Sequence, residues 1–367
     1  MAPTAVPTAT RPGGASRQGA QERYIHHYTE LLQRVKDSGL LRRRYGYYWT
    51  KMSLTVAALG ALGVGFAFLG NSWFQLLLAG LVAVIFAQFA FLGHDAAHRQ
   101  IFRTGWANEW AGLIHGTLFG GLSYGWWQGK HTRHHGNPNK QGKDPDIESA
   151  AVAFTPYALA ERRGLSAYLA GRQGYFFVPL LLLEGVSLHF HSVRRIFGRK
   201  PMKYRWCEVA FLAVRLGGYV TALFLVMSPG KAAVFLGVQL AAYGLYMGGA
   251  FTPNHTGMPI VPASLKIDFL RRQVLMSRNV TGGRAIHFAM GGLNYQIEHH
   301  LFPNMPRPNL RRAQPMVREA CAHNEIPYTE KRLFASYRIV LRYLNNVGLG
   351  ARDPFGCPLS AQLRAPR

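Results

Sequence analysis

Cysteine and acidic residues are both scarce in this 367-residue sequence. Its three cysteines, Cys207, Cys321 and Cys357, form no CxxC pair, which argues against a disulfide framework and a thiolate metal site. Only 17 Asp and Glu stand against 42 Lys and Arg, giving a formal net charge of +25. Such a charge could indicate nucleic-acid binding, but no nucleic-acid-binding motif is present. A basic surface facing anionic lipid headgroups explains the charge more simply.

The two ends of the chain lack long hydrophobic runs. Residues 1–20 have no apolar core of a cleavable signal peptide and are rich in Pro, Ala, Thr and Gly, which predicts a disordered tail. Residues 346–367 are rich in Gly, Pro and Arg and predict a basic tail. One membrane domain is expected over residues 21–345.

Formal charge is absent from the long segment between Met52 and Gly93, which Gly70-Asn71-Ser72 divides into two halves. Each half has about 20 residues, the length that crosses a bilayer as a helix. We therefore expect transmembrane helices at about residues 52–70 and 73–93.

A second apolar pair lies at about residues 208–228 and 232–252, with the turn-forming Pro229-Gly230-Lys231 between them. Arg215 lies inside the first of these segments, and it could either line a substrate passage or extend to the membrane surface. The prediction is an all-α integral membrane protein with four transmembrane helices in two hairpins.

Two other apolar stretches, Trp110–Trp127 and Tyr175–Leu183, are expected to form interfacial or re-entrant helices. Basic residues flank the predicted spans on one side, and the positive-inside rule places that side in the cytoplasm. Both termini and the polar part of the chain are then cytoplasmic, at the cytoplasmic membrane of a bacterium.

Three histidine motifs hold seven of the 15 histidines: His94-Asp-Ala-Ala-His98, His131-Thr-Arg-His134-His135 and Gln296-Ile-Glu-His299-His300. Residues spaced i, i+3 and i+4 share one face of a helix, and neutral imidazole binds first-row transition metals. With four spans all three motifs lie on one membrane face. The sequence therefore predicts a histidine-rich site large enough for two metal ions, within a cytoplasmic helical cap.

Other polar residues are candidates for the same site. His255 at the inner end of the last span is an expected additional ligand, and Asp95, Asn254 and Gln296 are possible partners of the ligands. His287 lies near the third motif but outside its helical spacing.

The acidic run Asp144, Asp146 and Glu148 follows the second motif. Its side chains could hydrogen-bond ligand histidines or form a solvated turn.

The three motifs resemble the histidine boxes of the membrane fatty acid desaturases. The flanking sequences also resemble that family: Ser123-Tyr124-Gly125-Trp126-Trp127, Lys143-Asp144-Pro145-Asp146, Gly291-Gly292-Leu293-Asn294-Tyr295 and Leu301-Phe302-Pro303. The resemblance covers about residues 45–330. Gln296 departs from the HxxHH form of the third box, and this departure resembles front-end desaturases and bacterial linoleoyl-CoA-desaturase-like proteins.

The resemblance implies an oxidoreductase that uses O2 and two electrons to place a cis double bond in an acyl-CoA or acyl-lipid chain. Its metal centre would hold two iron ions. The implied ligands are His94, His98, His131, His134, His135, His255, His299 and His300. Gln296 would suit desaturation between an existing double bond and the carboxyl end.

The N-terminal segment contains no His-Pro-Gly-Gly haem motif, so no fused haem domain is expected. A separate ferredoxin, flavin reductase or cytochrome b5 would supply the electrons. Related three-box lipid or carotenoid hydroxylases and ketolases are the main alternative, while a metal transporter would place its ligands at the bilayer midplane. A non-catalytic scaffold would not need seven convergent imidazoles.

Overall fold

The structure, a computed structural model, describes residues 14–149 and 151–350. Helix α1 (Gly14–Asp37) begins within the predicted N-terminal tail, and α16 (Leu333–Gly348) ends within the predicted C-terminal tail. Residues 1–13 and 351–367 of those tails lie outside the described residues.

All four predicted spans are helical in the structure. They are α2 (Tyr45–Leu69), α3 (Gln75–Ala97), the continuous rod α9 (Arg205–Leu212), η2 (Ala213–Gly218) and α10 (Tyr219–Val226), and α11 (Pro229–His255). Each is long and apolar enough to cross a membrane. The chain is therefore an α-helical, multi-pass membrane protein.

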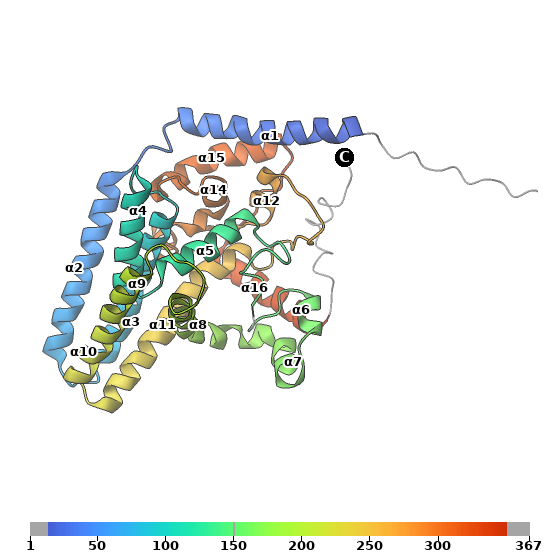
Figure 1. The fold of residues 1–367 in the computed structure, drawn as a ribbon. Coiled ribbons are helices and arrows are strands. Elements are labelled where there is room, and N and C mark those ends of the chain that lie inside the picture. Colours follow the sequence, from blue (N-terminus) through green and yellow to red (C-terminus); the bar gives the residue numbers. More distant parts are fainter. Residues whose placement is uncertain (1–13, 150, 351–367) are drawn as a thin grey trace, which may run out of the picture.

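A fifth helix, α8 (Gln173–Ile196), is also long and apolar enough to cross. The apolar segment Tyr175–Leu183 predicted from the sequence ends before Glu184, whereas the helix runs on to Ile196, so the predicted length was wrong. The helix continues because apolar Val186, Leu188 and Phe190 follow the glutamate. In Figure 1, α8 runs across the direction of α3 and α11 rather than along it.

The two hairpins lie side by side, and their connectors meet at one end of the bundle (Figure 1). Asn71 in the first connector accepts a hydrogen bond from the Ser228 amide at 3.0 Å and one from Lys231 Nζ at 2.7 Å. Helix α3 is the most buried of the candidate spans, and α11 packs against both α3 and α8. Both α3 and α11 consequently end, with their histidines, at the end of the bundle opposite the connectors.

Glycines allow α8 and α11 to pack backbone against backbone. A Cβ atom added at Gly185 would lie 2.2 Å from the Leu240 carbonyl oxygen, and one at Gly244 would lie 2.4 Å from the Gly185 nitrogen. No side chain fits in either place without moving a backbone.

Short helices and two strands form a cap at the end where α3 and α11 finish. The remaining elements are α4 (Gly105–Gly112), η1 (Leu113–Phe119), α5 (Tyr124–Gly136), α6 (Pro156–Ala160), α7 (Gly164–Gly171), α12 (Phe269–Leu275), β1 (Asn279–Thr281), α13 (Arg284–Ala289), η3 (Leu293–Tyr295), α14 (Gln296–Leu301), α15 (Arg307–His323) and β2 (Glu330–Arg332). Strands β1 and β2 pair in parallel. A buried apolar core joins α1, α12, α14 and α15, which fixes the cap around the third histidine motif.

The stretch Trp110–Trp127 forms no continuous span. Helix α4 continues into η1, the chain turns at Gly120 and Gly121, and α5 begins at Tyr124. Gly121 has φ +78, in the region that favours glycine. A broken path of this kind is compatible with the re-entrant or interfacial position predicted for Trp110–Trp127.

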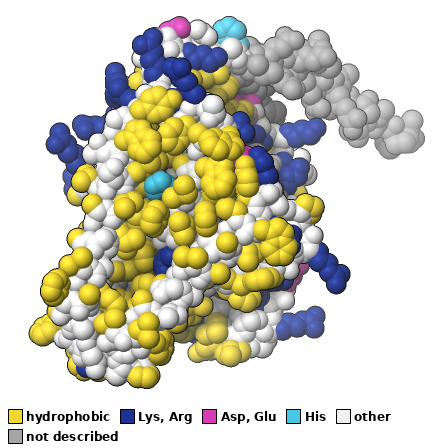
Figure 2. All heavy atoms as spheres, turned by 60° about the vertical axis from the view of Figure 1, so that its left-hand side comes forward, with side chains coloured by type: hydrophobic (Ala, Val, Ile, Leu, Met, Phe, Trp, Pro, Cys, Tyr) yellow, Lys and Arg dark blue, Asp and Glu magenta, His cyan; other side chains and the backbone are white. Residues whose placement is uncertain are grey.

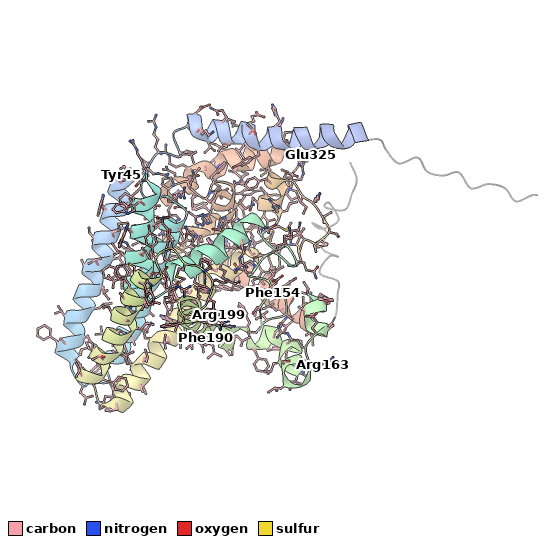
Figure 3. All side chains as sticks on the ribbon, in the orientation of Figure 1. Tyr45, Phe154, Arg163, Phe190, Arg199 and Glu325 are labelled. Carbon is pink, nitrogen blue, oxygen red and sulfur yellow. The ribbon has the colours of Figure 1, made fainter. Side chains whose placement is uncertain are left out.

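The outer surface of the bundle is apolar. Leu54, Phe68, Leu77 and Leu81 are among the exposed hydrophobic residues of α2 and α3 and of the connector between them, and hydrophobic side chains cover most of the middle of the face in Figure 2. Lys and Arg gather toward the upper margin of that face. Figure 3 shows Tyr45 at the upper end of α2, on the side of the cap.

Candidate metal centre

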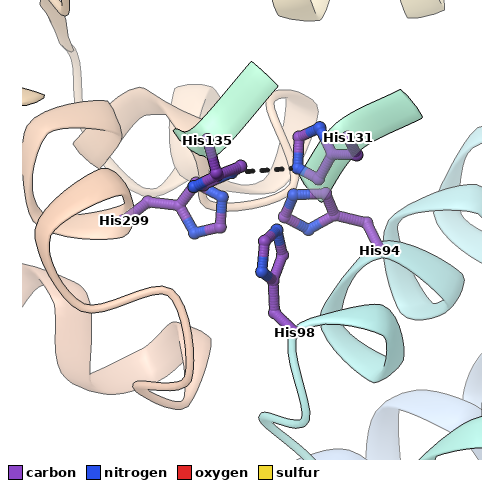
Figure 4. A group of neighbouring side chains, drawn as sticks. All are labelled: His94, His98, His131, His135 and His299. Atoms are coloured by element: carbon purple, nitrogen blue, oxygen red, sulfur yellow. Dashed lines mark hydrogen bonds between the residues drawn. The ribbon is translucent and has the colours of Figure 1, made fainter. Parts of the chain in front are cut away.

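Five imidazoles from three separate elements converge in the first of two clusters. His94 and His98 come from the end of α3, His131 and His135 from α5, and His299 from α14 (Figure 4). One nitrogen of each lies within 4.8 Å of one nitrogen of every other. We call this group the five-histidine cluster.

A second cluster lies directly beside it. His134 from α5, His255 from the end of α11 and His300 from α14 have nitrogen atoms within 4.8 Å of one another, and we call them the three-histidine cluster. The His135 and His300 rings stack with centroids 4.1 Å apart, so the two clusters are in direct contact. All three motifs and His255 thus lie in two adjoining clusters, and metal binding by these histidines stays a prediction.

Helix spacing explains how one motif serves both clusters. His131 and His135 are four residues apart on α5 and face the five-histidine cluster, while His134 faces the other. The neighbours His299 and His300 on the short helix α14 also divide between the two clusters. Each of these two elements therefore contributes to both clusters.

The N-terminus of α5 is held by a buried carboxylate. Ser123 caps the helix by accepting a hydrogen bond from the Trp126 amide, and its hydroxyl donates to Glu208 at 2.5 Å. The Gly125 amide donates to the same carboxylate at 3.0 Å. Glu208 on α9 thus fixes the start of the helix that carries the second motif.

Four histidines have their Nδ1 atoms held by outer partners. His94 Nδ1 lies 3.3 Å from Asp95 Oδ1, and His134 Nδ1 lies 3.0 Å from Asp144 Oδ1. His255 Nδ1 donates to the Met276 carbonyl at 2.8 Å, and His300 Nδ1 lies 2.9 Å from Gln273 Oε1. Such partners fix the tautomer and aim the Nε2 lone pair at a metal.

Several buried ring nitrogens have no hydrogen-bond partner among the described residues. They are His94 Nε2, His98 Nε2, His135 Nδ1, both nitrogens of His299 and His300 Nε2. A buried polar atom without a partner is costly, and metal coordination would satisfy one nitrogen of each ring. The arrangement therefore fits a pair of first-row transition metal ions held by imidazole.

The protonation states also suit metal binding. Burial, followed by the charge of neighbouring imidazoles, holds the pKa of His98, His131, His135, His299 and His300 well below the usual range. These rings are neutral at physiological pH, and neutral imidazole is the form that binds a metal. Burial also lowers the pKa of His134, but Asp146 and Asp144 together raise it above its usual value.

Gln296 lies against the three-histidine cluster. Its Nε2 atom is 2.9 Å from His255 Nε2, and its Oε1 accepts a hydrogen bond from Asn254 Nδ2 at 3.3 Å. The side chain that departs from the HxxHH pattern is thus beside the cluster that has fewer imidazoles. Asn254 precedes His255 in α11 and reaches the site through this bond to Gln296.

The three residues of the acidic run after the second motif have different contacts. Asp144 is fully buried and binds both His134 and the Asn139 amide. Asp146 is exposed on one side and bridges Lys130 at 2.7 Å and His134 at 3.3 Å. Glu148 is exposed. The hypothesis that this run hydrogen-bonds a histidine of the site is confirmed for Asp144, while Asp146 lies at ion-pair distance from the same ring.

The remaining sequence candidates lie outside the clusters. His287 pairs with Asn294 Oδ1 at 3.0 Å and stands against the Tyr295 ring. Arg215 donates to the Phe119 carbonyl at 2.9 Å and lies over the rings of Phe86 and Tyr219. It holds the end of η1 in place, a role that neither sequence-based alternative described.

Three polar residues at the site were missed by the sequence analysis: Gln273, Glu208 and Arg307. Gln273 contacts both His300 and the His135 carbonyl, and Arg307 pairs with Asp95 at 2.7 Å. All three are buried. The position of Glu208 at the edge of an apolar segment could have indicated a buried, functional carboxylate. Nothing in the sequence distinguishes Gln273 from other glutamines.

A small apolar cavity lies next to the five-histidine cluster. Its lining includes Gly93, Gly116, Trp127, Met247 and Phe251. The Trp127 ring stacks on the His131 ring with centroids 4.9 Å apart. The indole of Trp127 therefore lies between the cavity and the cluster. An apolar chain in the cavity would lie close to the metal-binding nitrogens.

Comparison with known proteins gives a consistent result. The chain matches the fatty acid desaturase family over residues 71–332. It is 30% identical to the Delta(6)-fatty-acid desaturase fat-3 of Caenorhabditis elegans, over 89% of this chain and 76% of that protein. It is 32% identical to the acyl-lipid (9-3)-desaturase of Physcomitrium patens, over 84% of this chain and 60% of that protein.

A third relative is the Delta(8)-fatty-acid desaturase of Helianthus annuus, which is 24% identical over 89% of this chain and 74% of that protein. The family match covers most of the chain and includes all three histidine motifs. This chain belongs to the fatty acid desaturase family, and it is an oxidoreductase of lipid metabolism.

Proposed function

We propose that this protein is an O2-dependent front-end acyl desaturase whose two clusters each hold one iron ion. The observation that carries the proposal is the pair of histidine clusters beside an apolar cavity, at the ends of membrane-type helices. When bound, the irons supply the dioxygen chemistry that removes hydrogen from an unactivated carbon. The acyl substrate could be carried by CoA or by a lipid.

The residues of the chain perform the remaining tasks. Trp127 and Phe251 form an apolar wall that presents an acyl chain and excludes water from the five-histidine cluster. Asp95, Asp144 and Gln273 hold ligand imidazoles in one orientation. His94, His98, His131, His135 and His299 would hold one iron, and His134, His255 and His300 the other.

The front-end assignment rests on Gln296 and on the relatives. Gln296 replaces a histidine beside the three-histidine cluster, and the relatives named above are Delta(6), Delta(8) and (9-3) desaturases. We infer that the new double bond forms between an existing one and the carboxyl end of the chain.

We also propose that α8 lies in the membrane plane. The motifs on α5 and α14 form one centre, so an even number of crossings must separate them. Three candidate spans lie between them: α8, the α9–α10 rod and α11. Helix α8 carries Glu184, Arg194 and Arg195 and runs across the others in Figure 1. The cap then faces the cytoplasm, in agreement with the positive-inside rule.

A separate acidic electron donor would suit the basic cap. Helix α15 packs on α14, which carries His299 and His300, and Arg311 and Arg312 on α15 are exposed. Opposite charge would steer an acidic protein to this surface.

The test is fatty acid profiling of cells that express the wild-type chain or His134→Ala, supplied with monounsaturated and diunsaturated acyl chains. We expect a product that has lost two hydrogens, with the new bond on the carboxyl side of an existing one, and its disappearance in the variant. His323→Ala is the matched control because that histidine is exposed and lies outside both clusters. A product that has gained an oxygen atom would instead support the hydroxylase alternative.

A further inference from the structure

A buried ion pair lies behind the five-histidine cluster. Arg307 Nη2 is 2.7 Å from Asp95 Oδ2, and both side chains are at most 3% exposed. The other oxygen of the same carboxylate, Asp95 Oδ1, faces His94 Nδ1 at 3.3 Å. Arg307, Asp95 and His94 therefore form a continuous series of contacts that ends at a nitrogen of the cluster.

Arg307 also makes hydrogen bonds to two of the transmembrane helices. Its Nη2 atom donates to the Phe91 carbonyl at 2.8 Å, one turn before Asp95 on α3. Its backbone amide donates to Tyr48 Oη at 3.2 Å, which joins α2 to the same network. The bond to the Phe91 carbonyl thus holds the guanidinium beside the carboxylate on α3.

The aliphatic stem of Arg307 touches the segment before the third motif. A Cβ atom added at Gly292 would lie 2.5 Å from Arg307 Cγ, and Gly292 has φ +86. Gly292 directly precedes η3, which leads into α14 and its histidines. One arginine therefore contacts the helix of the first motif and the turn that leads to the third.

We infer that Arg307 is a positioning residue of the metal centre, which aims Asp95 at His94 and sets the distance between α3 and α14. This inference rests on the proposed iron-binding function. Because Arg307 shares the charge of Asp95, it also limits how strongly that carboxylate polarises the His94 ring. Outer partners of this kind commonly change metal affinity by about 10- to 100-fold.

A purely structural role makes a different prediction. Removing one partner of a buried ion pair leaves a lone charge and destabilises the fold, whereas neutralising both partners is often harmless. The double variant Asp95→Asn/Arg307→Gln therefore separates the two roles. It restores stability in either case. Because Asp95 itself contacts His94, iron retention in the double variant is compared with that in Asp95→Asn alone, and only a positioning role of Arg307 predicts a further loss.

The experiment uses the full-length iron-loaded protein in detergent. It compares wild type, Arg307→Gln, Asp95→Asn and the double variant. The control is Arg312→Gln, an exposed arginine on the same helix. The measurements are thermal unfolding, iron loss to a chelator and the Mössbauer spectrum of ⁵⁷Fe-loaded protein. We expect Arg307→Gln to unfold at a lower temperature and to retain iron about 10- to 100-fold more weakly.

The double variant is expected to unfold near the wild-type temperature while losing iron faster than Asp95→Asn alone, with an altered spectrum for one of the two irons. The inference is overturned if the double variant matches Asp95→Asn in iron retention and spectrum, or if it fails to fold. If wild-type protein holds two irons but forms no unsaturated product, the proposed activity fails and the role of Arg307 still stands.

Discussion

At the scale of single residues, the orientation of each imidazole depends on a partner that is not itself a ligand. His94, His134, His255 and His300 each have Nδ1 bound by a carboxylate, an amide oxygen or a backbone carbonyl. The Nε2 atoms of His94 and His300 are buried and without a hydrogen-bond partner among the described residues. The sequence identified these histidines from their spacing, but it did not indicate Gln273 or the Met276 carbonyl as partners.

Asp144 provides the clearest test of such a partner. It is fully buried, and its two oxygens lie 3.0 and 3.1 Å from His134 Nδ1. We expect Asp144→Asn to weaken iron retention by about 10- to 100-fold, because the amide no longer fixes the His134 tautomer by charge. The measurement is iron loss to a chelator from purified protein.

The matched control is Glu148→Gln, an exposed carboxylate on the same loop. Equal iron retention in the two variants would mean that Asp144 only stabilises the loop.

At the scale of elements, the close packing of α8 against α11 requires a glycine where the two helices cross. A Cβ atom at Gly244 would lie 2.6 Å from the Leu181 carbonyl oxygen, whereas one at Gly237 on the same helix meets nothing within 4 Å. The sequence shows both glycines alike, and only the packing distinguishes them.

We predict that Gly244→Ala lowers stability by about 1–3 kcal/mol, because the added methyl group forces the two backbones apart. Gly237→Ala is the control and should unfold like wild type. The measurement is thermal unfolding in detergent, and equal midpoints for the two variants would contradict the close crossing.

The placement of α8 can be tested by labelling single cysteines in a variant that lacks the native ones. Arg172 and Arg199 flank α8, and Asn71 lies in a connector at the far end of the bundle. If α8 lies in the membrane plane, Arg172→Cys and Arg199→Cys react with a membrane-impermeant reagent from the same side. Asn71→Cys should react from the opposite side. Labelling of the first two from opposite sides would make α8 a span.

At the scale of the whole molecule, charge and hydrophobicity are separated. The middle of the face in Figure 2 is largely apolar and Lys and Arg gather toward its margin, while the chain carries a net charge of +25. This separation suits a protein that is held in a bilayer, and the basic margin would suit the proposed acidic electron donor.

Electron transfer from an acidic ferredoxin should therefore depend on salt. We expect the reduction rate to fall steeply between about 50 and 300 mM salt, because the screening length shortens over that range. Reduction by a small uncharged reagent is the control and should change little. A rate from the ferredoxin that is independent of salt would argue against electrostatic docking. The measurement is stopped-flow absorbance of the ferredoxin.

The sequence by itself determined the helical membrane character, both hairpins and the histidines that converge. These properties follow from run length, charge and spacing within single segments, which a chain carries whatever its tertiary fold. It underestimated the length of α8, because one glutamate was read as the end of an apolar segment.

Only the tertiary structure decided how the eight histidines divide into groups of five and three, and that Gln296 lies beside the smaller group. It also brought Arg307 to Asp95 across 212 positions of sequence and Gln273 to His300. Contacts of this kind depend on how separate elements pack. Sequence periodicity does not predict such contacts. It shows which residues share one face of a helix, but not which other helix that face packs against.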